Sequence, residues 1–197
     1  ACAPYRRLYL CNKNMVKMVT NNDDSSKAKH DLLAEVCYAA KYEGQSIAGY
    51  YPQYDSKYPG SGSTMCTMLA RSFADMGDIV RGKDLYRGNN KEKENLEKRL
   101  VEMFENIRKN NNNNELANLS IEQVREYWWN ANRLEVWKAI TCAAKVGDTY
   151  FRPTCGGDNE SPSMAKNNCR CEGANANQVP TYFDYVPQYL RWFEEWA

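Results

Sequence analysis

Apolar side chains recur at helical spacing in five stretches of the chain, which are separated by polar and glycine-rich segments. Apolar residues three and four positions apart lie on one face of a helix, so each stretch predicts an amphipathic helix that packs against a core. The predicted helices span residues 27–42, 63–82, 91–109 and 120–145, and a last helix begins near residue 187. The pattern therefore predicts an all-α fold, a helical bundle with long loops.

Several helix ends carry recognisable capping residues. Ser63 or Thr64 suits the start of the second helix, and Gly82 suits its end. Ser120 with Gln123 three residues later forms a capping box at the start of the fourth helix. The apolar stripes expected to face the core are Leu32, Leu33, Val36, Cys37 and Ala40; Met65, Met68, Leu69, Phe73, Met76, Ile79 and Val80; Leu96, Leu100, Phe104 and Ile107; Ile121, Val124, Trp128, Ala131 and Ile140; and Leu190, Phe193 and Trp196.

Three segments between the helices are predicted to be loops. Residues 44–62 are rich in Gly, Tyr and Pro, residues 110–114 are consecutive asparagines, and residues 147–180 are rich in Gly, Asn and Cys. Alternation of apolar and polar residues, as expected for a strand, occurs only weakly at 178–183. The apolar runs are far shorter than the ~20 residues that a membrane-spanning helix needs.

The chain has 197 residues, with 26 Lys and Arg against 25 Asp and Glu, and one histidine. Its formal net charge of +1 argues against a dedicated nucleic-acid binder, which usually presents a strongly basic face. The first 30 residues are nevertheless basic, because they contain six Lys and Arg but only Asp23 and Asp24 as acids. Because the chain has only one histidine, most metal-hydrolase mechanisms and Ser-His-Asp triads are disfavoured.

The eight cysteines are mostly separated by long and irregular spacings. Zinc modules usually contain two close Cys-x2-Cys pairs, whereas the one close pair here is Cys169 and Cys171. Disulfides formed in an oxidising compartment are therefore predicted in preference to a metal site. The pairing stays open, because eight cysteines can pair in many ways. The predicted disulfide cysteines are Cys2, Cys11, Cys37, Cys66, Cys142, Cys155, Cys169 and Cys171.

Other clusters of residues have ordinary structural explanations. His30 and Cys37 lie too far apart along one helix for proton transfer, so a cysteine hydrolase is disfavoured. The acids from Asp75 to Glu94 alternate with Arg and Lys, which favours a solvated, salt-bridged helix face. The tryptophans are expected in the core, with at most one of Trp128 and Trp129 central. The chain is thus predicted to be no enzyme and to bind no metal or cofactor.

Two groups of basic residues are candidates for binding an anionic partner. One group lies in the first 30 residues, and the other begins at the end of the second predicted helix. They could bind a sulfated or sialylated glycan through charge if the two groups converge in space, and otherwise they are ordinary surface residues. The candidate glycan- or receptor-binding residues are Arg6, Arg7, Lys13, Lys17, Lys27, Lys29, Lys83, Arg87, Lys91, Lys93, Lys98 and Arg99.

Several strings of the chain are similar to those of a known family. The strings are CAPYRRL at 2–8, AAKYEG at 39–44, CTMLARSFAD at 66–75, GDIVRGKDLY at 77–86, WWNANR at 128–133, VWKAITC at 136–142 and the run at 179–197. Through these strings the chain resembles, from end to end, the Duffy-binding-like domains of malaria parasites. The last run resembles the alpha type, the N-terminal adhesion domain of the Plasmodium falciparum erythrocyte membrane protein 1 family.

The resemblance implies an all-helical, disulfide-stapled fold of three subdomains. Residues from about 1 to 62 correspond to the end of the first subdomain, and residues from about 63 to 197 correspond to the second. The third subdomain and the segment that precedes these residues are expected to lie outside this chain. The chain is therefore expected to be one partial Duffy-binding-like domain.

The resemblance also implies a function in virulence, as a variant surface antigen on the extracellular face of the infected erythrocyte membrane. The expected partners of this part of a larger membrane-anchored protein are host antibodies and host cell-surface receptors or glycans, such as complement receptor 1, blood-group sugars or heparan-sulfate-like glycans. Binding to uninfected erythrocytes, called rosetting, is expected of the alpha type, and antigenic variation is expected in the three loops. The alternative is a non-binding scaffold or antigenic domain whose neighbouring domains engage the receptor.

Overall fold

The computed structural model describes residues 2–19, 25–88, 90–109, 114–156 and 161–196. Helices make up the regular structure of these residues, whose β-type pairings are isolated bridges between residues 146 and 170. The predicted all-α fold is confirmed. In chain order the elements are α1 (Tyr5–Leu8), α2 (Lys13–Val16), α3 (Ser25–Lys57), α4 (Met65–Arg81), α5 (Asn90–Lys109), α6 (Asn114–Ala117), α7 (Ile121–Ile140), η1 (Thr141–Ala143), η2 (Gly173–Asn175), η3 (Phe183–Tyr185) and α8 (Gln188–Trp196).

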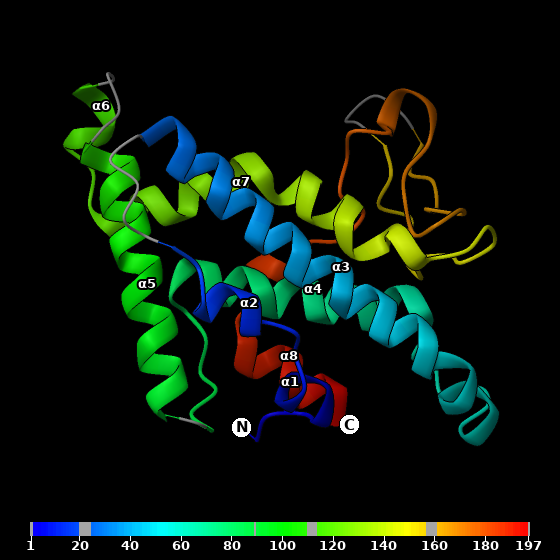
Figure 1. The fold of residues 1–197 in the computed structure, drawn as a ribbon. Helices are drawn as coiled ribbons and strands as arrows, with labels where there is room; N and C mark the ends of the chain where they lie inside the picture. The colour runs from blue at the N-terminus through cyan, green and yellow to red at the C-terminus, as the bar shows by residue number, and fades with distance from the viewer. Residues whose placement is uncertain (1, 20–24, 89, 110–113, 157–160, 197) are drawn as a thin grey trace.

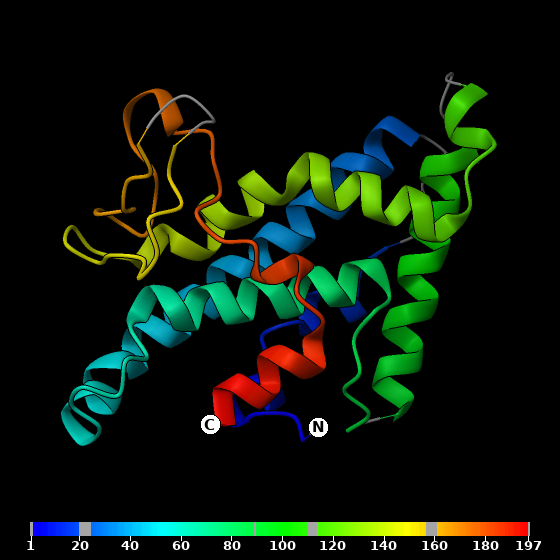
Figure 2. The ribbon, with the colours of Figure 1, turned by 180° about the vertical axis from the view of Figure 1, so that it is seen from behind.

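Three long helices, α3, α4 and α7, pack against one another and form the centre of the molecule (Figure 1). Helix α5 runs across one end of this group, and an irregular lobe, residues 144–156 and 161–182, lies at the other end. Helices α1 and α8 come from opposite ends of the sequence, yet both pack against α4 and lie side by side (Figure 2). Residues that are distant in the sequence therefore meet beneath α4.

The predicted ends of α4 and the start of α7 are confirmed by capping groups in the expected places. The Thr64 side chain accepts a hydrogen bond from the backbone N–H of Thr67, and Gly82 ends α4 in a left-handed conformation with φ of 74°. Ser120 and Gln123 form the full capping box of α7. These bonds satisfy N–H groups of the first turn, which have no partner within the helix.

Helix α3 corrects the prediction of a loop that begins at Gly44. The helix continues through Gly44 and Pro52 and ends at Lys57. Gly44 is buried where α3 crosses α7, and a Cβ atom there would overlap the carbonyl oxygen of Ile140. The glycine thus permits close packing of two helices instead of forming a turn. Within the predicted loop at 44–62, only residues 58–62 have turn or irregular structure.

The core lies between α3, α4, α5 and α7, as the apolar stripes predict, with two differences on α7. Both Trp128 and Trp129 are buried, because α7 packs on two sides. Trp128 meets Phe104 of α5 edge to face, whereas Trp129 lies against Phe73 of α4. The prediction that at most one of these tryptophans is central is therefore wrong, and Ala131, predicted to face inward, is exposed.

Helix α8 buries the opposite face to the one predicted. The stripe of Leu190, Phe193 and Trp196 was expected to face the core, but Phe193 is 72% exposed and Trp196 is 61% exposed. Arg191 and Trp192 face inward instead, and both donate hydrogen bonds to a carboxylate of α4. Polar contacts therefore hold α8 in place, and its apolar stripe faces outward.

The lobe is irregular, as predicted, and the weak alternation at 178–183 forms no strand in it. Two disulfides hold it: Cys66 of α4 is joined to Cys169, and Cys155 is joined to Cys171. Most of the asparagine run, predicted to be a loop, lies outside the described residues at 110–113, while Asn114 begins α6. Among the helices that the structure describes, none is both long and apolar enough to cross a membrane.

Candidate functional site

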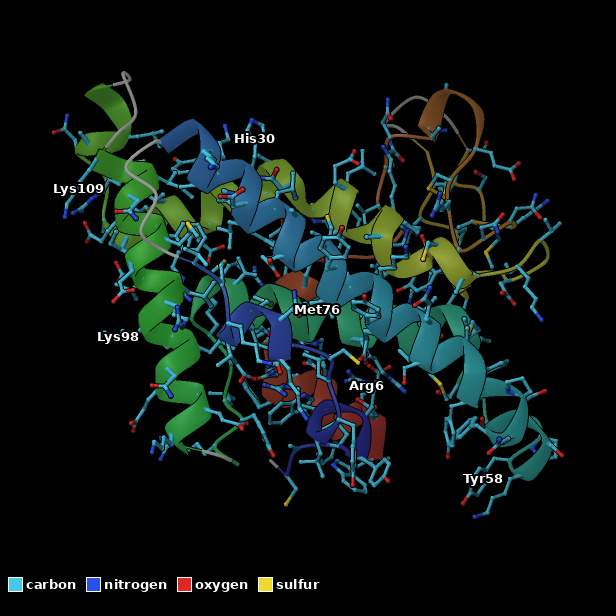
Figure 3. The ribbon with its side chains drawn as sticks, viewed as in Figure 1. Arg6, His30, Tyr58, Met76, Lys98 and Lys109 are labelled. Atoms are coloured by element: carbon cyan, nitrogen blue, oxygen red, sulfur yellow. A yellow bond between two sulfur atoms is a disulfide. The ribbon has the colours of Figure 1, made fainter. Side chains whose placement is uncertain are left out.

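The first two predicted basic residues point inward. Arg6 forms ion pairs with Asp75 of α4 at 2.7 Å and with Glu195 of α8 at 2.9 Å (Figure 3). Arg7 pairs with Asp84 at 2.7 Å, and both of these side chains are nearly buried. Both arginines thus join segments of the fold and do not present their charge to an external ligand.

Three further candidates have partners within the protein. The ammonium group of Lys93 donates to two carbonyl oxygens of the segment that precedes α5. Arg99 of α5 donates to the carbonyl oxygen of Met18 at 2.6 Å, and Lys83 forms an ion pair with Glu126. Lys93 and Arg99 are half-buried, whereas Lys83 is exposed.

The remaining candidates are exposed, and three of them lie on two segments that are in contact. The exposed ones are Lys13, Lys17, Lys27, Lys29, Arg87, Lys91 and Lys98. The hydrogen bond between Arg99 and Met18 ties α5 to the chain just after α2. Lys98 and Lys17 are the sequence neighbours of these two residues, and Lys13 lies one turn before Lys17. We name Lys13, Lys17 and Lys98 the lysine face, because the segments that carry these exposed residues meet at the hydrogen bond between Arg99 and Met18.

The acids of α4 are buried, which corrects the predicted solvated helix face. Asp75 accepts hydrogen bonds from Arg191 at 2.7 Å, from Gln188 at 3.1 Å and from Trp192 at 3.2 Å. Asp78 accepts from Arg191 at 2.5 Å. A buried carboxylate needs such partners, because water no longer solvates it. The acids are salt-bridged as predicted, and besides Arg81 of the same helix, which pairs with Asp78, their partners are arginines of distant segments.

The two buried carboxyls titrate differently, although burial alone would raise the pKa of both. At Asp75 the charges of Arg6 and Arg191 outweigh burial, and the pKa is lowered from its usual value. At Asp78 burial outweighs Arg191 and Arg81, and the pKa is raised to about 6. These carboxyls are enclosed by the fold, so their titration bears on its stability.

The residues of the WWNANR string serve packing. Trp129 and Arg133 both donate to the carboxylate of Asp184 in η3, at 2.9 Å and 2.7 Å respectively. One turn after Arg133, Trp137 donates to the carbonyl oxygen of Cys169 at 3.1 Å. Trp129 and Arg133 of this string, together with Trp137, therefore fix η3 and the lobe on α7.

Two clefts flank the segment from η3 to α8. The first, of about 340 Å³, is lined by charged groups that already pair with one another, such as Arg81 with Asp78 and Lys83 with Glu126. The second, of about 310 Å³, is lined by three aromatic rings, by apolar side chains and by charged groups that include Arg152. Within the described part of the chain, no three His, Cys, Asp or Glu side chains gather as metal ligands.

The structure pairs four of the eight cysteines, fewer than predicted. The free thiols belong to Cys2, Cys11, Cys37 and Cys142, which lie on four separate segments of the chain. Burial raises the pKa of Cys11 and of Cys37 to about 11 in each case. Thiolates are the reactive form of cysteine, so these two thiols are poor nucleophiles near neutral pH.

Two groups of neighbouring tyrosine rings, exposed except for the half-buried Tyr54, were not predicted from the sequence. Tyr50, Tyr54 and Tyr58 follow one another along the last half of α3, with ring centroids 6.3 and 5.2 Å apart. Tyr5 and Tyr9 stack in the same way at the start of the chain, with centroids 4.7 Å apart. The signal was the spacing of four residues, but the nearby glycines and proline favoured a loop for this part of α3.

The family model and the curated relatives that match this chain are all of Duffy-binding proteins. The family model of the Duffy binding domain matches residues 1–191. The Duffy receptor of Plasmodium vivax (strain Salvador I) is 28% identical over 150 residues, which are 73% of this chain and 12% of that protein. The Duffy receptor gamma form of Plasmodium knowlesi is 23% identical over 100% of this chain and 15% of its own length.

Solved structures show the same fold. The NTS-DBL1(alpha-1) domain of the Plasmodium falciparum membrane protein 1 (PfEMP1) from the varO strain is 39% identical, with a TM-score of 0.79. The match covers 100% of this chain and 43% of that one. The ICAM-1-binding DBLbeta domain of PfEMP1 IT4var13 is 28% identical with a TM-score of 0.70, over 97% of this chain and 41% of that one.

The chain thus spans less than half of these solved structures and 12 to 15% of the curated relatives named above. The likeness to an alpha-type domain over the full chain confirms the predicted resemblance and the Duffy-binding-like fold. The family is one of binding domains and not of enzymes. Because the family model matches nearly every residue, the chain belongs to the Duffy binding domain family.

Proposed function

We propose that this chain is a host-cell adhesion module of a variant antigen on the surface of the infected erythrocyte, and that its lysine face binds a sulfated glycan. The observation that supports the proposal is the contact between α2 and α5, because Lys17 and Lys98, the sequence neighbours of the bonded Met18 and Arg99, are exposed there, as is Lys13. Clustered cations create a positive potential that attracts and retains a polyanion. A glycan of this kind on uninfected erythrocytes would produce rosetting.

The relatives support a role in adhesion. The curated relatives are named Duffy receptors, and a solved relative is described as ICAM-1-binding. Those ligands belong to the relatives, with which this chain shares its scaffold. Lys13, Lys17 and Lys98 fall between the strings that carry the family resemblance, so the proposed ligand rests on the surface of this chain.

Salt should weaken this binding, since exposed charges interact through water. The Debye length is about 8 Å at physiological ionic strength, so the attraction depends on several lysines acting together. The ion pair of Lys98 with Glu102, at 4.0 Å, is solvent-exposed and offers little resistance to an incoming sulfate. Affinity should therefore scale with the number of free lysines on the face.

Heparin chromatography tests the proposal. The oxidised protein should bind at physiological salt and elute in a salt gradient, and the triple variant Lys13→Ala, Lys17→Ala, Lys98→Ala should elute at distinctly lower salt. A matched control, Lys41→Ala, Lys145→Ala, Lys166→Ala, removes the same charge from exposed positions elsewhere. Equal loss of retention in both triples would mean that binding reflects total charge only. Absence of retention of the wild type would place adhesion outside this chain.

A further inference from the structure

Two carboxylates of α4 lie one turn apart where α8 docks beneath this helix (Figure 2), and α8 supplies one arginine to both. The Nη2 atom of Arg191 lies 2.7 Å from Oδ1 of Asp75 and 2.5 Å from Oδ2 of Asp78. Both acidic side chains are buried, at 0% and 5% exposure. Two negative charges enclosed this closely repel each other, which favours the uptake of a proton by one of them.

The two carboxylates accept hydrogen bonds from unequal sets of donors. Asp75 accepts from Arg6 of α1 and from three side chains of α8, one of which is Arg191. Asp78 accepts from Arg191 at 2.5 Å and from Arg81 at 3.1 Å. The negative charge of Asp78 is therefore the less well compensated of the two.

Both arginines that pair with Asp78 have other acceptors. Arg191 also pairs with Asp75, and it donates to backbone carbonyl oxygens of the segment that precedes α8. Arg81 lies 3.6 Å from Glu126 of α7 and donates to a carbonyl oxygen of its own helix. A neutral Asp78 would thus leave neither arginine without a partner, and α8 would stay docked.

Asp78 also lines the first cleft, of about 340 Å³, through which protons from the solvent can reach it. Among the acids that line this cleft, Asp184 and Glu126 each pair with a cation of their own, whereas Asp78 shares both of its arginines. The charged groups of the elements around it are Asp75 and Arg81 of α4, Arg191 of α8, Asp184 of η3 with its partner Arg133, Glu126 of α7 with its partner Lys83, Asp84 with its partner Arg7, Arg6 of α1 with its partner Glu195, and Glu43 of α3.

We propose that Asp78 is a proton switch within the docking site of α8: it binds a proton in mildly acidic solution, and α8 is then held more firmly than at neutral pH. A neutral carboxyl costs less to bury than a carboxylate does. The proton also removes the repulsion between Asp78 and Asp75, while Asp75 keeps its charge and its ion pair with Arg191. Acid therefore relieves an unfavourable contact and leaves the favourable one in place.

The pKa values of the two carboxyls agree with this assignment. Burial raises the pKa of Asp78 from 3.8 to about 6, whereas the charges of Arg6 and Arg191 outweigh burial at Asp75 and lower its pKa. A raised pKa in the folded state means that the folded protein binds this proton more tightly than the unfolded chain does. The resulting stabilisation is fully present below the unfolded pKa of 3.8 and is lost as the pH rises through about 6.

Urea unfolding at about pH 7.4 and about pH 5 tests the proposal. The variant Asp78→Asn carries an amide that resembles the neutral carboxyl in shape and does not titrate. Between the two pH values the unfolding equilibrium constant of the wild type should fall about tenfold relative to that of Asp78→Asn, because only the wild type binds the proton. Two controls should keep the pH dependence of the wild type: Asp55→Asn makes the same replacement at an exposed aspartate, and His30→Gln removes the one histidine, a residue type that titrates in this range.

Two measurements on the wild type follow the proton without any substitution. Carbon-13 NMR should show one aspartate carboxyl that titrates near pH 6. Hydrogen-exchange protection factors in α8 should be higher at about pH 5 than at about pH 7.4. Absence of an aspartate that titrates near pH 6, lower protection of α8 in acid, or equal pH dependence of the wild type and Asp78→Asn would overturn the proposal. None of these measurements involves a glycan, so the outcome is independent of the lysine face.

Discussion

At the scale of single residues, two glycines of α3 have opposite roles. Gly44 is buried at the crossing with α7, where a Cβ atom would overlap the backbone of Ile140. Gly49, little more than one turn later, has open space where its Cβ atom would be. Glycine weakens a helix through backbone entropy, so it is needed at the first position and only costs stability at the second.

We therefore expect Gly44→Ala to lower the free energy of unfolding by about 1–3 kcal/mol through overpacking. Gly49→Ala should raise it by about 0.5–1 kcal/mol, because alanine is the better helix former. Urea denaturation of both variants against the wild type measures the two changes. A Gly44→Ala protein as stable as the wild type would contradict the close approach of α3 and α7.

Residue-scale features were predictable where the interaction is local. The caps at Thr64 and Ser120 follow from residues three positions apart, and both are confirmed. The burial of Asp75 was not predictable, since Arg191, the cation that makes it tolerable, lies 116 residues away. The lysine face depends on a contact of the same kind, between Arg99 and Met18.

At the scale of elements, periodicity located the helices but did not orient all of them. Helix α8 has an apolar stripe, yet it buries Arg191 and Trp192, because the carboxylates of α4 form a polar docking surface. A stripe predicts which residues share a face, and only the neighbouring element determines whether that face is buried. Helix α3 shows the converse, since packing on α7 stabilises helical structure in a segment with unfavourable residues.

The two disulfides should differ in their contributions to stability. The bond between Cys66 and Cys169 closes a loop with a sequence separation of 103, and the bond between Cys155 and Cys171 closes one of 16. In the chain-entropy description the longer loop contributes more, about 4–5 kcal/mol against about 3 kcal/mol. Replacing both cysteines of each pair by alanine and comparing urea unfolding checks this order.

A thiol count is the control for this prediction. The unfolded, unreduced wild-type protein should react with four equivalents of a thiol reagent, because Cys2, Cys11, Cys37 and Cys142 are free. Each double variant should show the same four, since it removes one complete disulfide. A count of zero in the wild type would instead support the pairing of all eight cysteines that the sequence predicts. Spacing alone could not select among the possible pairings.

At the scale of the whole molecule, one cluster joins both ends of the sequence to the centre. Arg6 of α1 and Arg191 of α8 share the carboxylate of Asp75, and Arg6 also pairs with Glu195. Because Asp75 is fully buried, each ion pair depends on the others for its exclusion of water. The all-α class of the fold was predictable from local periodicity, but this cluster of ion pairs at Asp75 was not. The subdomain boundary near residue 62 stays a prediction.

We expect Arg6→Ala to lower the free energy of unfolding by about 1.5–3 kcal/mol, the usual contribution of hydrogen bonds to charged groups. Hydrogen exchange should become faster in α8, although the substitution lies at the other end of the sequence. The pKa of Asp75 is lowered in the folded state, so this stabilisation is present at neutral pH. It is lost as the pH falls below about 4 and through the lowered pKa.

Lys13→Ala is the matched control for Arg6→Ala. It also removes a positive charge near the start of the chain, but Lys13 is exposed. Its effect on hydrogen exchange in α8 should be negligible. Equal effects of the two substitutions would show that net charge, and not the buried ion pairs of Asp75, stabilises α8.

The adjacency of α1 and α8 has a mechanical consequence. Besides the pair between Arg6 and Glu195, Trp196 donates to the carbonyl oxygen of Cys2 at 3.0 Å, so residues 2 and 196 lie close together. Tension applied between these two positions loads the short path through α1 and α8. The central helices lie off this line of force. Tension between residues 2 and 196 is therefore expected to break the contact between α1 and α8 before it unfolds the central helices.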